Sequence, residues 1–164
     1  MNSSQYWLLK TEGESYPIEK LQKDKKTPWS GVRNFQARNF MKNDMRLGDL
    51  CLFYHSSSSQ NGVYGIARVA SKPYPDPTQF DPPAPRLRRA GKKSHYFESR
   101  STKEKPYWWL VDIAFVRKFK HPILAIEMKN DSELSGMMLW HTPRLSIQPV
   151  SERHFKHITE KLAS

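Results

Sequence analysis

The sequence predicts an α+β fold built around a mixed, curved sheet. Short runs of branched and aromatic residues, typical of strands, alternate with short amphipathic patterns typical of helices. The connections between the strands are hairpin-like or irregular, and regular strand–helix–strand crossovers do not recur. Neither an internal repeat nor a linker divides the 164 residues, so we expect a single domain over residues 3–162.

The first half of the chain contains three predicted strands and two predicted helices. Pro17 suits the first position of a helix, and Asn34 is a favourable N-cap for the next one. A turn at Gly48 and Asp49 leads into a strand in which Leu50, Leu52 and Tyr54 face opposite to Cys51, Phe53 and His55. The predicted elements are strand 5–10, helix 17–24, helix 35–43, the strand that follows this turn, and a returning strand at 63–71.

The second half begins with a segment that cannot form regular structure. Residues 72–85 hold six prolines in fourteen positions, which excludes a helix or a central strand. The chain then stays polar and basic, and we expect a mobile loop over residues 83–105. The elements predicted beyond it are strand 106–119, a helical stretch at 122–128, a short turn at 131–139, strand 144–150, and helix 152–162 capped by Ser151.

The net charge of +11 and the pI of about 9.8 favour an anionic partner, either nucleic acid or an anionic membrane, although a protein can also be basic without such a partner. Cys51 is the single cysteine, which rules out an internal disulfide and favours a reducing compartment. The chain has no apolar run of the roughly 18 residues that span a bilayer, and residues 1–5 lack a secretory pattern. We therefore expect a cytoplasmic protein, or a nuclear one if the source cell has a nucleus.

The positive charge is concentrated in residues 86–105. This segment has eight lysines and arginines against two glutamates, which is +6 of the total of +11. A basic loop beside a proline-braced segment is suited to following a phosphate backbone, although it can also be merely solvated. The residues that we expect to contact phosphates are Arg86, Arg88, Arg89, Lys92 and Lys93.

The sequence lacks the common catalytic signatures: it has no Walker loop, nucleophile elbow, dinucleotide fingerprint or zinc-protease motif. His154 and His157 are three residues apart on a predicted helix, but no third ligand is near them, so we expect a surface pair and no metal site. Asp76 and Asp81 each precede a proline, where turn chemistry explains them better than acid–base catalysis. We expect no cofactor, and we expect Cys51 to be a buried, inert thiol.

Trp29 is the aromatic residue that packing explains least. It follows Pro28 and precedes Ser30 and Gly31, so it lies in a turn rather than in a strand. A large aromatic ring on a loop either plugs a neighbouring core or presents a flat face to a ligand, and the residues alone leave both roles open.

Several stretches together resemble the EVE family of the PUA-like group. The matching stretches are YWLLKTE, TPWSGVRNFQARNFM, GDLCLFYHS, GIARV, YPDPTQFDP, WLVDIAFV and RLSIQPV, in that order, and they run from residue 6 to about residue 155. The resemblance implies a PUA-like β pseudo-barrel flanked by short helices, with a pocket for a nucleobase. The sequence departs from the usual family pattern in three places. Position 13 is glycine where the family usually has proline, position 17 is proline where it usually has a serine that caps the helix, and residues near 83–94 resemble an insertion.

The resemblance also implies which residues form the base pocket. Trp29 corresponds to a wall of an aromatic cage. Asn34 has a second possible role as a helix cap, with the two roles evenly matched. The other implied pocket residues are Val32, Arg33 and Asn34 on the rim, Tyr54, His55 and Ser56 on the facing strand end, and Lys10, Thr11 and Glu12 at the opening of the first strand.

We therefore expect a nonenzymatic nucleic-acid binding domain that recognises a modified base, with modified cytosine in DNA as the leading candidate. Stacking on an aromatic ring contributes roughly 1–3 kcal/mol per base and suits an extruded nucleotide. Two alternatives stay open. One is an RNA-binding PUA-like module, and the other is a nucleotide-processing hydrolase in which Glu12 and His55 form a general acid–base pair.

Overall fold

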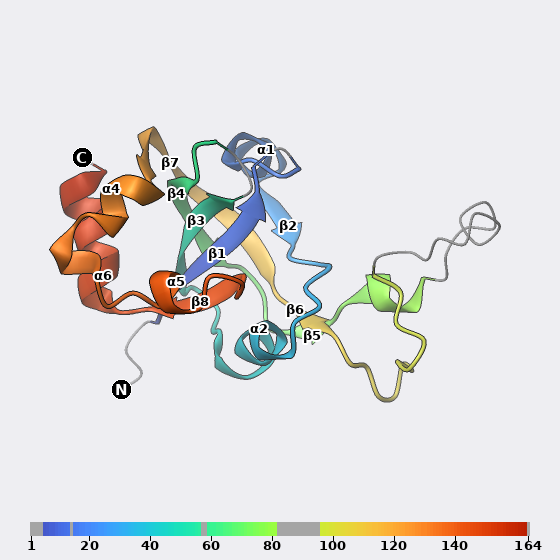
Figure 1. Ribbon diagram of the computed structural model, residues 1–164. Coiled ribbons are helices and arrows are strands. Elements are labelled where there is room, and N and C mark those ends of the chain that lie inside the picture. Colours follow the sequence, from blue (N-terminus) through green and yellow to red (C-terminus); the bar gives the residue numbers. More distant parts are fainter. Residues whose placement is uncertain (1–4, 14, 57–58, 82–95, 164) are drawn as a thin grey trace.

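The computed structural model describes residues 5–13, 15–56, 59–81 and 96–163, and it confirms the mixed α+β architecture. A curled six-stranded sheet forms the centre of the molecule, and short helices surround it (Figure 1). Its order is β2-β7-β4-β3-β1-β8, in which β1 is parallel to β3 and the other neighbours are antiparallel. The strands are β1 (Tyr6–Glu12), β2 (Lys26–Pro28), β3 (Leu50–Ser56), β4 (Gly62–Val69), β7 (Asp112–Leu124) and β8 (Ile147–Val150).

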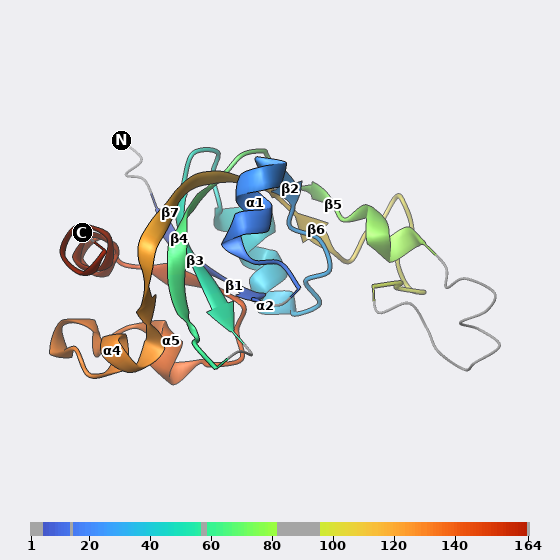
Figure 2. The same cartoon turned by 90° about the horizontal axis from the view of Figure 1, so that it is seen from above.

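The sheet curls into a half-barrel because β7 is long and bends along its length (Figure 2). The pairing of β4 with β7 shifts register twice, and that of β3 with β4 shifts once, between Phe53 and Tyr54. Such irregularities increase the local twist and bend of a strand. A separate two-stranded pair, β5 (Tyr74–Pro75) with β6 (Trp109–Leu110), lies beyond one end of the main sheet (Figures 1 and 2).

The helices cover the two faces of the sheet in two groups. In both ribbon views α1 and α2 lie on one side, while α4 and α6 lie on the other (Figures 1 and 2). Both α2 and α6 continue in wider π-type turns, Phe40–Asp44 and His157–Leu162 respectively. The helices are α1 (Ile18–Asp24), α2 (Phe35–Asn39), α4 (Ala125–Lys129), α5 (Met138–His141) and α6 (Glu152–Lys156).

Two hydrophobic cores, one on each face, hold these layers together. Trp7 and Leu9 of β1 enter the first core, whereas Leu8 between them enters the second. The same alternation divides β3, with Phe53 in the first core and Tyr54 in the second, as the period-two pattern predicted. Because both faces are covered, β3 is buried from Cys51 to His55.

Two predicted boundaries are wrong in the second half of the chain. The predicted strand 106–119 is divided between β6 and β7, because Trp109 and Leu110 pair with β5 instead of the main sheet. The predicted helix 122–128 begins only at Ala125, because Ile123 and Leu124 still pair with β4. Both differences come from strand partners that are distant in sequence, which a local pattern does not reveal.

The five arginines and lysines expected to contact phosphates, residues 86, 88, 89, 92 and 93, lie outside the described residues. The described part of the basic segment is tied to the proline-rich segment: Glu98 N donates to the carbonyl of Gln79, and the Ser101 hydroxyl donates to its side-chain oxygen at 2.7 Å. Among the described residues, no helix is long and apolar enough to cross a membrane.

Candidate functional site

A cavity of about 590 Å³ opens where the end of β1 faces the loop that follows β2. Three aromatic residues, Tyr16, Trp29 and Tyr96, contribute to its walls. The remaining lining residues are polar or small: Lys10, Thr11, Glu12, Ser15, Thr27, Pro28, Ser30, Gly31, Val32, Arg33 and Ser146. Concave sites with aromatic walls and a few polar groups are typical of small-ligand pockets.

Trp29 is half-buried and serves both the core and the cavity. Its ring meets Phe53 of the first core edge-on at 5.8 Å and 76°, and Tyr16 edge-on at 6.3 Å and 88°. The backbone N–H of Trp29 donates to the carbonyl of Val111 at 3.0 Å, which fixes the loop against the sheet. The two roles that the sequence left open are therefore combined in one indole, which packs against the first core and also lines the cavity.

Gly31 brings the third aromatic residue, Tyr96, against the loop. Gly31 has φ +83°, a conformation that favours glycine. A Cβ atom at this position would lie only 2.7 Å from a ring carbon of Tyr96, so the phenol packs directly on the glycine backbone. Tyr96 is 45% exposed and adds a wall to the cavity from a segment far away in sequence.

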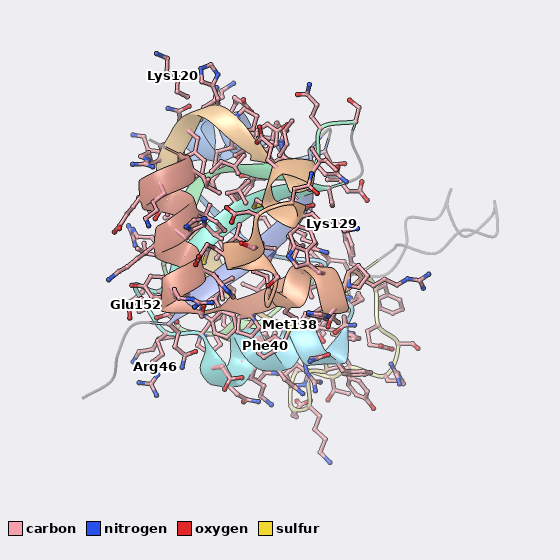
Figure 3. All side chains as sticks on the ribbon, turned by 60° about the vertical axis from the view of Figure 1, so that its left-hand side comes forward. Phe40, Arg46, Lys120, Lys129, Met138 and Glu152 are labelled. Atoms are coloured by element: carbon pink, nitrogen blue, oxygen red, sulfur yellow. The ribbon has the colours of Figure 1, made fainter. Side chains whose placement is uncertain are left out.

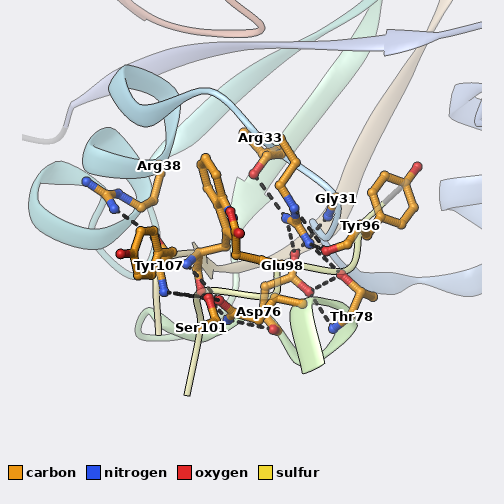
Figure 4. A network of polar contacts seen from close by, with 12 residues as sticks. Gly31, Arg33, Arg38, Asp76, Thr78, Tyr96, Glu98, Ser101 and Tyr107 are labelled. Carbon is orange, nitrogen blue, oxygen red and sulfur yellow. Dashed lines mark hydrogen bonds and ion pairs between the residues drawn. The ribbon is translucent and has the colours of Figure 1, made fainter. Parts of the chain in front are cut away.

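Asp76 holds this loop in place from below (Figure 4). Its carboxylate is 1% exposed and accepts hydrogen bonds from Gly31 N at 2.8 Å, Thr78 N at 2.8 Å and the Thr78 hydroxyl at 2.6 Å. Burial by itself raises the pKa of Asp76, but the hydrogen bonds from Thr78, Gly31 and Arg33 outweigh it and lower the pKa below its usual value. The predicted turn role of Asp76 is confirmed, and the turn supports the cavity wall.

Arg33 completes this network and is fully engaged within it (Figure 4). Its Nη1 donates to Asp76 at 3.1 Å and to the carbonyl of Val32 at 3.1 Å. Its Nη2 donates to the Thr78 hydroxyl at 3.0 Å and to the carbonyl of Tyr96 at 2.6 Å, and its Nε also donates to that carbonyl at 3.2 Å. A guanidinium has five N–H donors, and all five have acceptors here. Arg33 therefore lines the cavity as a positioning residue that joins the loop after β2 to Tyr96.

The end of β1 supplies the polar side of the cavity. The Thr11 hydroxyl donates to the carbonyl of Tyr16 at 3.0 Å, and Ser15 donates to the carboxylate of Glu12 at 3.3 Å. The Lys10 ammonium donates to the carbonyl of Pro143, and burial lowers the pKa of Lys10. Glu12 is exposed, so its carboxylate keeps acceptor capacity for a ligand in the cavity.

The other four expected pocket residues do not line this cavity. Asn34 is the N-cap of α2, where its side chain accepts from Ala37 N at 2.9 Å, so the structure places it in the capping role. Tyr54 and Ser56 line a second cavity on the other face of the sheet. The Ser56 hydroxyl donates to the carbonyl of Thr11 at 3.2 Å and thus ties β3 to β1.

His55 is buried and engaged elsewhere. Its Nε2 accepts from the backbone N–H of Ile18 at 3.1 Å, and its ring stacks on Tyr64 with centroids 3.8 Å apart. Burial lowers the pKa of His55, partly opposed by the charge of Glu19. His55 and Glu12 open into different cavities, so the structure does not bring together the acid–base pair that a hydrolase requires.

The histidine pair near the carboxyl terminus differs from the expectation. His154 is 9% exposed rather than on the surface, because the helix turns this face toward the second core. His157 is half-buried and contacts Asp131 with 2.7 Å between its Nε2 and Oδ2 of the carboxylate. In the described part of the chain, no three histidine, cysteine, aspartate or glutamate residues are grouped so that they could hold a metal ion.

Sequence reasoning missed two of the three aromatic walls. Tyr16 lies in the irregular segment after β1, and its hydroxyl donates to Asp24 at 2.8 Å, which orients the ring. Tyr96 reaches the cavity through contacts with Gly31 and Arg33 that span more than sixty residues. The available signal was an aromatic pair, Tyr96 and Phe97, inside an otherwise polar and basic segment.

Comparison with known proteins agrees with this architecture over almost the whole chain. The EVE domain model matches residues 5–161. Thymocyte nuclear protein 1 of Gallus gallus is 38% identical over 172 residues, covering 93% of this chain and 66% of the relative. The Homo sapiens protein of the same name is 35% identical over 176 residues, covering 96% of this chain and 73% of the relative. The chain thus spans roughly two-thirds to three-quarters of these relatives.

Solved structures of other proteins also superpose on almost the whole chain. A hypothetical protein from Leishmania major superposes with a TM-score of 0.83 at 39% identity, covering 96% of this chain and 94% of that one. The human THYN1 protein, in complex with DNA that contains 5-methylcytosine, superposes with a TM-score of 0.82 at 34% identity, covering 96% of both chains. The PUA-like half-barrel expected from the resemblance is confirmed, and the chain belongs to the EVE domain family.

Proposed function

We propose that this protein binds DNA and recognises a modified cytosine, with 5-methylcytosine as the first candidate, in the cavity walled by Trp29. The observation that carries the proposal is this cavity of about 590 Å³ with three aromatic walls. It lies in a chain whose fold superposes on that of a protein crystallised with DNA containing 5-methylcytosine. The net charge of +11 is in keeping with a polyanionic partner.

The chemistry of the lining fits an extruded cytosine. Stacking against an aromatic face contributes roughly 1–3 kcal/mol per base, and Trp29 is the lining indole. The exposed carboxylate of Glu12 is an acceptor suited to the N4 amino group of cytosine, a pairing that glutamate also makes in DNA grooves. We assign Glu12 to reading the base edge and Trp29 to stacking.

Recognition of the methyl group is expected to be modest. Burying one methyl group contributes about 0.8 kcal/mol, which corresponds to a roughly fourfold preference. A larger preference requires a penalty for the unmodified base, such as a polar group left unpaired.

We propose further that binding occurs without chemical turnover. Support comes from His55, whose Nε2 is occupied by the N–H of Ile18 and whose ring opens into a different cavity from that of Glu12. A DNA-binding function would place the protein where DNA is found, which is the nucleus of a eukaryotic cell or the cytoplasm of a bacterium.

Fluorescence anisotropy with matched oligonucleotides tests the proposal. The set contains one sequence as DNA and as RNA, single- and double-stranded, with cytosine or 5-methylcytosine at one position, all at one salt concentration. We expect DNA with 5-methylcytosine to bind most tightly, and prolonged incubation to leave every oligonucleotide chemically unchanged. Equal affinity for both bases would contradict modified-base recognition. Tighter binding to RNA than to DNA would favour the alternative of an RNA-binding module. Formation of a reaction product would favour the alternative of a nucleotide-processing hydrolase.

A further inference from the structure

A second cavity of about 400 Å³ lies on the opposite face of the sheet from the first one. Tyr54 of β3 and Leu139 of α5, which line it, belong to the second core, and Trp140 packs against that core. The first cavity, in contrast, is lined by Trp29 and Tyr16, which pack against the first core.

The two cavities meet at the free end of β1. Strand β8 pairs with β1 from Tyr6 to Leu9, and the backbone N–H of Lys10 donates to the carbonyl of Ser146 at 2.8 Å. Beyond Lys10, no strand of the described residues lies beside the last two residues of β1, Thr11 and Glu12, on that side. Lys10 lines both cavities. Lys10 and Tyr54 are paired across the parallel strands β1 and β3, so their side chains leave the same face, and the ammonium lies 5.8 Å from the ring centre.

The second cavity is lined by cationic, hydroxyl and aromatic side chains, types that contact phosphates and bases. Tyr54 is only 6% exposed, and its hydroxyl forms no hydrogen bond with any described residue. The hydroxyl oxygen is not among the fully buried side-chain atoms that lack a partner, so it is accessible from the cavity and can donate to a ligand there. Lys129, at the end of α4, is exposed and forms no ion pair within the described residues. Trp140 is half-buried, and its indole N–H is already bonded to the carbonyl of Leu134 at 2.8 Å, which fixes the ring.

We propose that this second cavity binds the nucleotide next to the recognised one on the same DNA strand. Lys129 and Lys10 bind its phosphate, the Tyr54 hydroxyl donates to it, and Trp140 contacts the base or sugar. The inference rests on the proposed function, because it assumes that the first cavity holds an extruded base. In this arrangement the DNA strand passes around the end of β1, from one face of the protein sheet to the other.

Protein NMR of the full chain can follow the two cavities separately. The indole N–H signals of Trp29 and Trp140 report on the first and second cavities, and each is assigned with the corresponding phenylalanine variant. One titration uses 5-methyldeoxycytidine, which has no phosphate, and the other uses a single-stranded DNA oligonucleotide that contains 5-methylcytosine. We expect the nucleoside to shift only the Trp29 signal and the oligonucleotide to shift both.

A matched pair of lysine variants tests the phosphate contact. Lys129→Gln should weaken oligonucleotide binding and reduce the slope of log K against log salt by about 0.7, the value for one phosphate contact of a single strand. Lys120→Gln is the control, because Lys120 is an exposed lysine of β7 at a separate place on the surface (Figure 3). The Tyr54→Phe variant should also bind more weakly while keeping the preference for the methylated base.

The outcomes separate the inference from the proposed function. If the oligonucleotide shifts Trp29 but leaves Trp140 unchanged, or if Lys129→Gln and Lys120→Gln have the same salt slope, the second cavity is not part of the binding site and the function stands. If the oligonucleotide shifts neither signal, the proposed function fails and this inference fails with it.

Discussion

At the scale of single residues, the cavity depends on contacts that join distant segments to one loop. Trp29 and Gly31 belong to that loop, Asp76 fastens it, and Arg33 connects it to Tyr96. Every donor of the Arg33 guanidinium is used inside the protein. The cation that the sequence suggested as a ligand contact is therefore better understood as part of the wall.

The Gly31→Ala substitution tests whether Tyr96 forms part of the binding site. A left-handed conformation costs a residue other than glycine about 1–2 kcal/mol. The added Cβ would also lie only 2.7 Å from a ring carbon of Tyr96 and would displace that ring. We expect lower stability together with weaker oligonucleotide binding, measured by urea unfolding and anisotropy.

Gly48→Ala is the matched control for this substitution. Gly48 has φ +95°, but an added Cβ there would meet nothing within 4 Å. It should cause a similar loss of stability with unchanged affinity. If Gly31→Ala also binds normally, Tyr96 is not a wall that the ligand uses.

At the scale of elements, α1 shows how one side chain can replace a missing cap. Pro17 precedes this helix and has no side-chain oxygen with which to cap it. The Nε2 of His55 accepts the Ile18 N–H instead and joins the helix to β3. An imidazole nitrogen can accept a hydrogen bond only while it is unprotonated.

This contact predicts a pH-dependent stability near neutrality. Burial lowers the pKa of His55 in the folded protein, so between that value and the ordinary pKa of about 6.5 the unfolded chain binds more protons. Stability should therefore fall as the pH decreases from about 7. The His55→Gln variant, studied by urea unfolding at several pH values, should lose part of this slope.

Burial also lowers the pKa of His154, so His154 adds its own pH dependence to the stability. This contribution is the same in the wild-type and His55→Gln proteins, because both contain His154. The control is His121→Gln, a substitution at an exposed position of β7. It should leave the slope of the wild-type protein unchanged. An identical slope in the wild-type and His55→Gln proteins would show that this contact does not couple stability to pH.

Elements with a clear local pattern were predictable from the sequence. The alternation in LCLFYH placed Phe53 and Tyr54 on opposite faces. Of the two roles left open for Asn34, pocket rim and helix cap, the structure shows the cap. Features that depend on partners distant in sequence could not be predicted. Examples are the division of the predicted strand at Val111 and the contribution of Tyr96 to the cavity. Of the ten pocket residues that the resemblance implied, six line the cavity. The alternation did not reveal which face of the sheet carries the Trp29 cavity, and Tyr54 and Ser56 line a cavity on the other face.

At the scale of the whole molecule, the two cores bury the middle of β3 from solvent. Cys51 lies in the middle of β3 and is fully buried, and burial together with the charge of Asp49 raises the pKa of its thiol. We expect a thiol reagent to label the native protein only as fast as it unfolds, and to label one thiol at once in urea. Rapid labelling of the native protein would show that the sheet opens locally around β3.

The charge of the whole molecule leads to a second expectation about binding. The basic residues 86–93 supply much of the net charge, and their contact with phosphates stays a prediction. Replacing Arg88, Arg89, Lys92 and Lys93 with glutamine together should weaken binding to all oligonucleotides about equally and flatten the salt dependence. An unchanged salt slope would mean that this segment does not contact the nucleic acid.

The central claim is that Trp29 stacks on the recognised base. The most direct measurement compares Trp29→Ala with Trp109→Ala, a half-buried tryptophan outside the cavity, for 5-methylcytosine binding and for thermal unfolding. Loss of stacking by roughly 1–3 kcal/mol predicts a 5- to 150-fold weaker complex for Trp29→Ala alone. The loss of stability should stay below the roughly 3–5 kcal/mol of a fully buried tryptophan. A Trp29→Ala protein that melts far earlier but, while folded, binds the methylated oligonucleotide as tightly as the wild type would contradict the account.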